Sequence, residues 1–253
     1  MFRLRLFAIT AFALLALPRA AAQDFWQAKP FPTWSKAESE KMLRDSPWAQ
    51  HITLSQVIMA GFSTGQQSRN SGVGAGSPGV GNPAAVSEAQ HSELPHLTYI
   101  AQLRSALPVR QAVVRQRQLA EGYDAKPPQQ RAALDAKTDA YLAKPQDDIV
   151  VYVAYESNLG NYANLEARYW KQQTYDLLKN KVFLTIGGAR LAPVGYAATD
   201  GAFQFNFERP AEVLHAGSVT LEFTHPPVGA LATETVRIEF KLNKMLVNGE
   251  PAL

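Results

Sequence analysis

The sequence predicts an α+β fold, mainly an antiparallel β-sandwich of Ig-like architecture, with two or three accessory helices and a disordered Gly/Ser-rich loop. The main observation is the alternation of apolar and polar residues in segments 203–208, 219–224 and 236–243, which is typical of antiparallel strands with one buried face. The loop is expected at residues 63–90, where glycine, serine and asparagine dominate and apolar surface is too scarce to offset the entropy of ordering. Helices are expected at residues 108–143, where apolar residues recur at helical spacing.

The first 22 residues have the features of a cleavable secretory signal peptide. Arg3 and Arg5 form a cationic start, and the apolar run at residues 7–17 is shorter than the roughly 20 residues that span a bilayer. Small side chains lead to an expected cleavage site between Ala22 and Gln23. A retained membrane anchor is the alternative, and the short run argues against it. We therefore expect an exported protein, periplasmic or extracellular, with no membrane span after cleavage.

Composition narrows the range of partners. The chain has a formal net charge of +3, but the expected signal peptide carries three of its 25 basic side chains and no acidic one. The remaining 22 basic side chains balance the 22 acidic ones. Since attraction to polyanions needs a basic excess or a clustered patch, we expect no nucleic-acid partner. The chain has no cysteine, so neither a disulfide nor a cysteine-linked lipid anchor is expected.

The sequence divides into three parts. Residues 1–22 form the signal peptide, and residues 23–50 form an N-terminal Trp-rich segment with a short helix. Residues 51–253 are expected to form a single β-rich domain, since a chain of this length can bury its own core. This domain carries the disordered insertion at 63–90 and a helical insertion at 108–143.

The Trp-rich segment offers a candidate partner-binding surface. Its helix is expected to start at Ser35, because Ser35 and Glu38 match a capping box in which each side chain satisfies a free amide at the helix start. Trp26, Trp34 and Trp48 lie in or beside this segment. The favoured interpretation is that the three rings pack the segment onto the domain, since tryptophan is usually buried. The alternative is an exposed aromatic platform for a glycan or a partner protein.

The next part of the chain predicts two strands, two helices and a third strand. The strands are expected at residues 51–62 and 97–103, and the helices at 108–121 and 128–143. The continuous apolar run at residues 149–155 predicts a central strand covered on both faces.

Three arginines occur on the first of these helices, away from its apolar stripe. Arg110, Arg115 and Arg117 fit an anion-binding stripe or a solvated face. Because acidic residues lie nearby, the solvated face is the expected arrangement.

In the C-terminal part, the sequence pattern that predicts secondary structure is weak at first and regular later. A partial helix is expected within residues 158–180. A strand at residues 182–186 then enters a tight turn at Gly187 and Gly188. After the three alternating segments, Asn248 and Gly249 predict a final turn.

Two glycine motifs match enzyme signatures but lack the required context. Ser63 is the central residue of a G-x-S-x-G motif, whose chemistry needs a helix directly after the serine. A G-x-G-x-x-G motif at residues 74–79 would also have to open a helix to bind a dinucleotide. Both motifs lead into the glycine- and proline-rich tract, which cannot supply that helix. No cofactor is therefore expected.

Histidines and carboxylates give no clear catalytic set. His91, Glu93 and His96 could form half of a metal site, but zinc needs four ligands, or three and a water. His51, His215 and His225 are scattered in sequence, and His225 is explained by a turn at a strand end. Nearly every acidic residue is expected at a solvent-facing position. No metal site is therefore expected.

Several segments together resemble an uncharacterised family of secreted bacterial proteins of unknown function. The segments that carry the resemblance are residues 24–26, 29–30, 34–35, 45–49, 105–110, 240–242 and 245–249. The resemblance spans most of the chain after residue 22, outside the glycine-rich loop. It implies export and a single domain, and it brings no functional residues.

The expected function is that of an exported, non-enzymatic binding or envelope-associated module. Its partner would be an unknown protein or a glycan. The alternative is a periplasmic hydrolase or metal-dependent enzyme that uses Ser63 or the His91/His96 pair.

Overall fold

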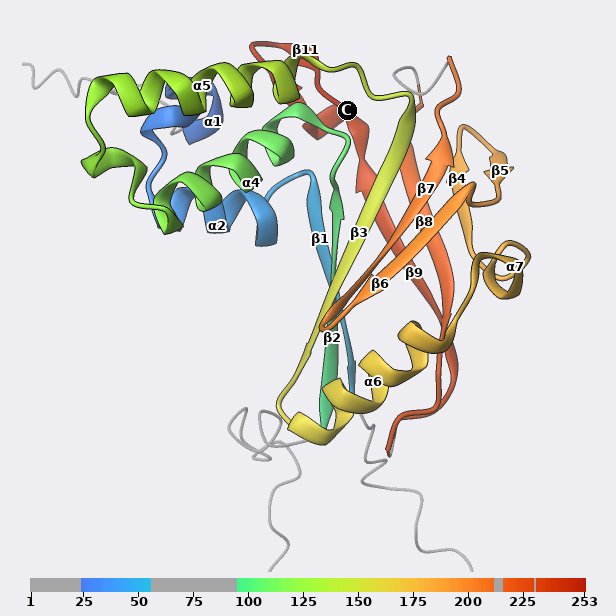
Figure 1. The fold of residues 1–253 in the computed structure, drawn as a ribbon. Coiled ribbons are helices and arrows are strands. Elements are labelled where there is room, and N and C mark those ends of the chain that lie inside the picture. Colours follow the sequence, from blue (N-terminus) through green and yellow to red (C-terminus); the bar gives the residue numbers. More distant parts are fainter. Residues whose placement is uncertain (1–23, 56–94, 212–215, 230) are drawn as a thin grey trace, which may run out of the picture.

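The protein has an α+β fold built from antiparallel sheets. The structure, a computed structural model, describes residues 24–55, 95–211, 216–229 and 231–253 (Figure 1). The predicted signal peptide and the predicted disordered insertion lie outside these residues.

Two larger sheets and one two-stranded ribbon are present in the described residues. The five-stranded sheet has the order β1–β2–β3–β7–β6, with β1 Ala49–Ser55, β2 His96–Leu103, β3 Asp148–Ser157, β7 Ala202–Glu208 and β6 Gly195–Thr199. The four-stranded sheet has the order β5–β4–β8–β9, with β5 Ala189–Leu191, β4 Phe183–Ile186, β8 Ser218–His225 and β9 Glu234–Lys241. The ribbon pairs β10 Leu246–Val247 with β11 Glu250–Pro251.

The alternating segments form strands as predicted. In β7, Phe203, Phe205 and Phe207 are buried on one face, while the residues between them are less buried. The same alternation occurs in β8 and β9. Period-2 alternation in the sequence therefore identifies three strands that bury one face each.

The central strand β3 differs from its prediction. It does lie inside the five-stranded sheet, between β2 and β7. However, Ile149, Val151 and Val153 are fully buried, whereas Val150 and Tyr152 between them are only partly buried. The strand is thus covered completely on one face only, because in an antiparallel sheet an apolar residue can remain on the half-exposed face.

The two larger sheets share one core. The Tyr99 ring of β2 lies edge-on to Phe223 of β8, with 5.1 Å between ring centroids. Phe203 of β7 also contacts Phe223, at 5.5 Å. At one edge, β9 lies against β1. Aromatic side chains thus fill the space between the sheets, where edge-to-face contacts are favourable.

Six α-helices occur in the described part of the chain. They are α1 Phe25–Ala28, α2 Lys36–Arg44, α4 Leu107–Ala120, α5 Pro128–Ala143, α6 Gly160–Gln172 and α7 Tyr175–Leu178, with 3-10 turns η1 Phe31–Thr33, η3 Tyr123–Ala125 and η5 Leu242–Lys244. Figure 1 shows α1, α2, α4 and α5 gathered beside one end of the five-stranded sheet, with α6 near the other end. The predicted helical insertion corresponds to α4, η3 and α5.

The predicted capping box and the predicted final turn are confirmed, and a glycine ends α4. The Ser35 side chain accepts a hydrogen bond from the Glu38 amide, and Glu38 accepts one from the Ser35 amide, which is the capping box of α2. Gly122 adopts a left-handed φ of 66° after α4, where glycine has no steric penalty. Asn248 and Gly249, with φ of 53° and 83°, form the turn between β10 and β11.

The three tryptophans of the N-terminal segment are buried. Trp26, Trp34 and Trp48 are 8%, 1% and 0% exposed, and the rings of Trp26 and Trp48 lie edge-to-face at 5.7 Å. The Trp48 indole N–H donates to the carbonyl of Ala252 near the C-terminus. The three rings thus pack residues 24–48 onto the body of the protein, as the favoured interpretation predicts. Partner binding at Trp26, Trp34 and Trp48 stays a prediction.

The prediction of a solvated arginine face on α4 is wrong for two of its three residues. Arg117 is exposed, but Arg110 and Arg115 are each only 4% exposed. Arg115 donates to the Trp34 carbonyl at 2.7 Å and forms a two-pronged ion pair with Asp124 at 2.9 and 2.8 Å. Buried charges need such partners. Arg115 therefore fastens the N-terminal segment and η3 to α4.

No helix within the described residues is both long enough and apolar enough to cross a membrane.

Candidate functional site

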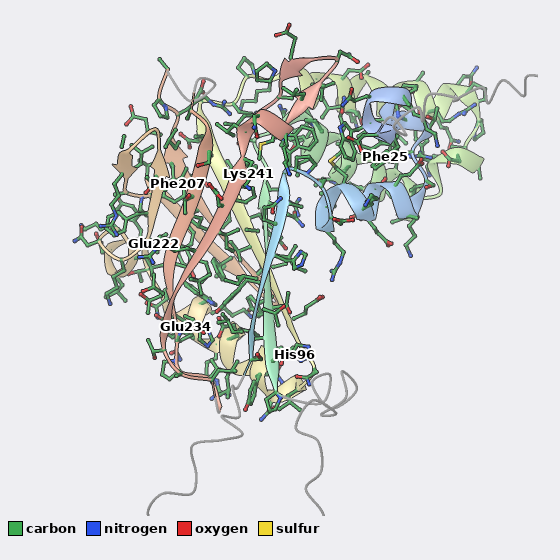
Figure 2. The ribbon with its side chains drawn as sticks, turned by 180° about the vertical axis from the view of Figure 1, so that it is seen from behind. Phe25, His96, Phe207, Glu222, Glu234 and Lys241 are labelled. Carbon is green, nitrogen blue, oxygen red and sulfur yellow. The ribbon has the colours of Figure 1, made fainter. Side chains whose placement is uncertain are left out.

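The predicted enzymatic residues are not brought together within the described chain. Ser63 and His91 lie outside the described residues. His96 begins β2 and donates its amide proton to Asn158, and it pairs with Ser55 at one end of the β1–β2 ladder. His51 pairs with Ile100, four residues further along that ladder. Figure 2 shows His96 at the end of the strands that is far from Phe25 and the helices around it. The hydrolase and metal alternatives stay predictions.

The described residues contain no group of three or more histidine, aspartate or glutamate side chains placed to share a metal ion.

A buried polar cluster corrects two expectations about titratable residues. His225, at the end of β8, is fully buried and is not explained by its turn. Glu166 of α6 is also fully buried, although the acidic residues were expected to face solvent. The two side chains meet at Tyr99 of β2, so that the cluster joins both sheets to α6.

Hydrogen bonds connect the two titratable side chains through Tyr99. The Tyr99 hydroxyl donates to Glu166 Oε1, and the Trp170 indole N–H donates to the same oxygen at 2.7 Å. The Tyr99 hydroxyl also forms a hydrogen bond with His225 Nδ1 at 2.8 Å. Glu166 Oε2 and His225 Nε2 have no hydrogen-bond partner among the described residues.

Burial keeps the side chains of Glu166 and His225 both neutral between about pH 4 and pH 7. Loss of solvation raises the pKa of Glu166 to about 7 and lowers the pKa of His225 to about 4. Glu166 Oε1 and His225 Nδ1 lie 3.9 Å apart. With a pKa near 4, however, His225 is neutral at pH 7, and the two groups form no ion pair there.

The cluster is closed to solvent, and this limits its chemistry. Tyr99, Glu166 and His225 are each 0% exposed, so a substrate cannot touch them in this conformation. The arrangement therefore suits a polar link between two sheets and a helix more than a catalytic centre.

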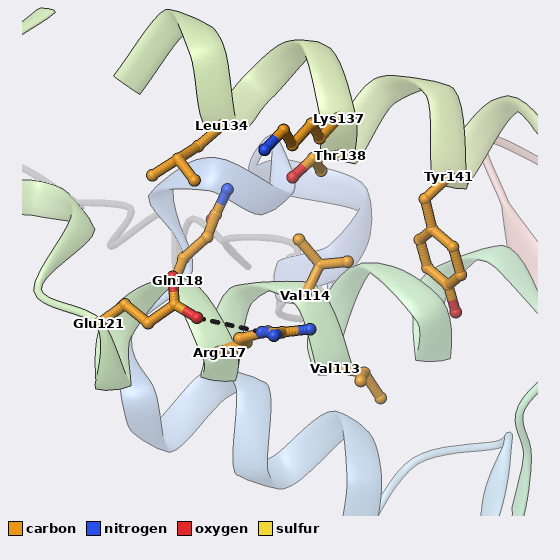
Figure 3. A pocket seen from close by; sticks show the side chains of 9 residues that line it. All are labelled: Val113, Val114, Arg117, Gln118, Glu121, Leu134, Lys137, Thr138 and Tyr141. Carbon is orange, nitrogen blue, oxygen red and sulfur yellow. Dashed lines mark hydrogen bonds and ion pairs between the residues drawn. The ribbon is translucent and has the colours of Figure 1, made fainter. Parts of the chain in front are cut away.

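A second site is open to solvent and lies in the helical insertion. A cleft of about 560 Å³ separates α4 from α5, within the 300–1,000 Å³ that is usual for small-molecule sites. Figure 3 shows the side chains of both helices around it. The residues that line the cleft are Val113, Val114, Arg117, Gln118 and Glu121 from α4 and its end, and Leu134, Lys137, Thr138 and Tyr141 from α5.

Gln118 is the unusual residue in this cleft. The residue is 6% exposed, and neither its amide nitrogen nor its amide oxygen has a hydrogen-bond partner among the described residues. Figure 3 shows Gln118 extending from α4 toward α5. Buried polar groups are nearly always paired, and leaving one unpaired costs roughly 1–3 kcal/mol. Gln118 therefore presents an unused donor and an unused acceptor at the cleft.

The cleft carries one positive charge that no ion pair among the described residues balances. Arg117 forms an ion pair with Glu121 at 3.0 Å, so these two charges balance. Lys137 of α5 has no ion-pair partner in the part of the chain that the structure describes. The cleft thus combines apolar walls, one unpaired amide and one uncompensated cation.

The α5 helix is held by contacts near its C-terminal end and near its middle. Near its C-terminal end, Arg110 of α4 donates to the carbonyls of Tyr141 and Lys144, and the Arg110 guanidinium stacks 4.8 Å from the Tyr141 ring centre. Near its middle, the Tyr123 hydroxyl donates to Asp135 at 2.6 Å. No residue of α5 is buried among the described residues.

The sequence contains a signal for this site that the apolar pattern obscures. Arg110, Val114 and Gln118 recur every four residues, which places them on one face of α4. Because this stripe is mixed in polarity, a search for apolar periodicity favours the other face of the helix and misses it.

Comparisons with protein-family models, with curated proteins and with solved structures found no match to this chain.

Proposed function

We propose that this protein is an exported, non-enzymatic binding or envelope-associated module whose ligand site is the cleft between α4 and α5. The observation that carries the proposal is Gln118, a buried amide at the wall of a ligand-sized cleft whose nitrogen and oxygen both lack a hydrogen-bond partner in the described part of the chain. Binding sites typically combine apolar walls with a few well-placed polar groups, and a ligand would supply the missing partners of Gln118.

The proposal also covers the way in which the two larger sheets pack. The two antiparallel sheets would form a β-sandwich of Ig-like architecture, which serves as the rigid support for the helices. The shared aromatic core between β2, β7 and β8 supports this arrangement. Export rests on the signal-like pattern of residues 1–22 and on the resemblance to secreted bacterial proteins.

A screen of small molecules tests the binding function. The purified protein would be heated with compounds of varied charge and polarity, and a binder is expected to raise its melting temperature by mass action. The effect should be weaker in Gln118→Leu and remain unchanged in Gln172→Leu, which changes an exposed glutamine on α6. If binders stabilise Gln118→Leu as strongly as the parent protein, or if no compound stabilises the parent, the proposed function is wrong.

A further inference from the structure

We infer that the cleft between α4 and α5 binds an N-acylated amino acid or a similar amphipathic monocarboxylate that carries an amide. This inference rests on the proposed function and specifies its ligand. The carboxylate would lie at Lys137, the ligand amide at Gln118, and the acyl chain between the apolar walls of the two helices.

The charges at the cleft favour a single negative charge on the ligand. The ion pair between Arg117 and Glu121 leaves no net charge on α4 at this point. The ammonium of Lys137 then remains as one uncompensated positive charge in the described part of the cleft. A monoanion would balance it, whereas a cation would be repelled, and a neutral compound would lose the charge-assisted hydrogen bond.

The Gln118 amide favours a ligand with an amide of its own. Gln118 presents an N–H donor and a C=O acceptor that are both buried and that have no partner in residues 24–55, 95–211, 216–229 and 231–253. A carboxylate alone can only accept hydrogen bonds, so it would leave the Gln118 oxygen without a donor. An amide group in the ligand supplies both a donor and an acceptor.

The walls of the cleft favour an apolar body. Val114 of α4 lies across the cleft from Leu134 and Tyr141 of α5 (Figure 3), and Val113 also contributes to the lining. Tyr141 is 50% exposed, and no residue of α5 is buried among the described residues. An acyl chain in the cleft would cover this apolar surface, and each buried methylene contributes roughly 0.8 kcal/mol.

Isothermal titration calorimetry with three probes tests the roles of the carboxylate and of the amide separately. N-decanoylglycine carries the acyl chain, the amide and the carboxylate. N-decanoylglycinamide lacks the charge, and decanoate lacks the amide. N-decanoylglycine is expected to bind about tenfold more tightly than either of the other two, because one charge-assisted or amide hydrogen bond is lost in each comparison.

Variants assign each preference to its residue. Lys137→Gln is expected to abolish the preference for N-decanoylglycine over N-decanoylglycinamide. Gln118→Leu is expected to abolish the preference for N-decanoylglycine over decanoate. Lys181→Gln, at an exposed lysine outside the cleft, should leave both preferences intact. Circular dichroism would verify that each variant is folded.

The outcomes distinguish the ligand class from the function. If N-decanoylglycinamide binds as tightly as N-decanoylglycine and both depend on Gln118, the monocarboxylate inference is wrong and the binding function stands. If none of the three probes binds, the inference is also wrong, and the broader screen decides the binding function. If sedimentation shows a dimer that Val114→Glu dissociates, the cleft is occupied by a second copy and the inference is overturned.

Discussion

The Tyr99 hydroxyl donates a hydrogen bond to Glu166 inside the protein, where both side chains are fully buried. Tyr99 belongs to β2 of the five-stranded sheet and Glu166 to α6, and His225 of the four-stranded sheet completes the contact at 2.8 Å from the same hydroxyl. One hydroxyl thus connects three separate elements of the fold. Because low polarity strengthens hydrogen bonds and penalises unpaired groups, this small cluster should control how stability varies with pH.

Glu166→Gln is expected to make the free energy of unfolding increase as pH rises from 4 to 6.5. Burial lowers the pKa of His225 to about 4 in the folded protein, from 6.5. The unfolded chain therefore binds more protons in this window, and folding becomes more favourable as pH rises. The shift corresponds to about 3 kcal/mol in total. Urea unfolding at several pH values would measure it, and a flat profile would contradict the neutral, buried His225.

His225→Phe is expected to give the opposite trend. Burial raises the pKa of Glu166 from 4.5 to about 7, so the folded protein binds more protons than the unfolded chain between these values. The free energy of unfolding should then decrease as pH rises from 4.5 to 7, again by about 3 kcal/mol. In the parent protein the two trends oppose each other between pH 4.5 and 6.5. The same urea series tests this, and identical slopes in the two variants would refute the assignment.

Tyr99→Phe is expected to reduce the free energy of unfolding by about 1–3 kcal/mol, because it leaves His225 Nδ1 unpaired and removes one of two hydrogen bonds to Glu166 Oε1. Loss of a hydrogen bond to the carboxylate should also raise the pKa of Glu166 further. Urea unfolding at pH 6 measures the first effect. Tyr175→Phe, at a residue that is 42% exposed, is the control, and an equal loss in both variants would argue against a special role for Tyr99.

Local patterns in the sequence predicted most of the secondary structure. Alternation identified β7, β8 and β9, and the helix of the Trp-rich segment follows from Ser35 and Glu38. These features depend on residues that are close in sequence, and for this reason they can be read without knowing the fold.

The candidate sites could not be predicted in the same way. Glu166 lies 67 residues from Tyr99 in the sequence, and His225 lies 126 residues from it. Only the packing of two sheets and α6 brings the three side chains together. Arg115 is charged and lies on a helix with an exposed arginine, so the sequence indicates solvent exposure. Its burial depends on Trp34, 81 residues away. Long-range pairing of polar residues therefore escapes patterns based on hydrophobicity.

Arg115→Leu is expected to destabilise the protein by about 2–4 kcal/mol, since it leaves the Trp34 carbonyl without its donor and breaks the ion pair with Asp124. Arg117→Leu is a matched control on the same helix. Its side chain is 81% exposed, and a surface change of this kind alters stability by within about 0.5 kcal/mol. Thermal unfolding compares the two variants. Proteolysis should also release residues 24–34 faster from Arg115→Leu, and equal losses in both variants would contradict the fastening role of Arg115.

Gly229→Ala is expected to be more destabilising than Gly249→Ala, although both glycines have positive φ, 58° and 83°. At Gly249 none of the described atoms lies within 4 Å of an added Cβ, so its variant reports only the backbone penalty of about 1–2 kcal/mol. At Gly229 the Cβ would lie 2.2 Å from the Tyr162 ring, which must move. Since Tyr162 is in the first turn of α6, four residues before Glu166, this movement should also disturb the buried cluster. Adding Tyr162→Ala removes the clash. The double variant should therefore lose less free energy of unfolding than the sum of the losses in the two single variants. If the losses simply add, the ring does not pack against Gly229.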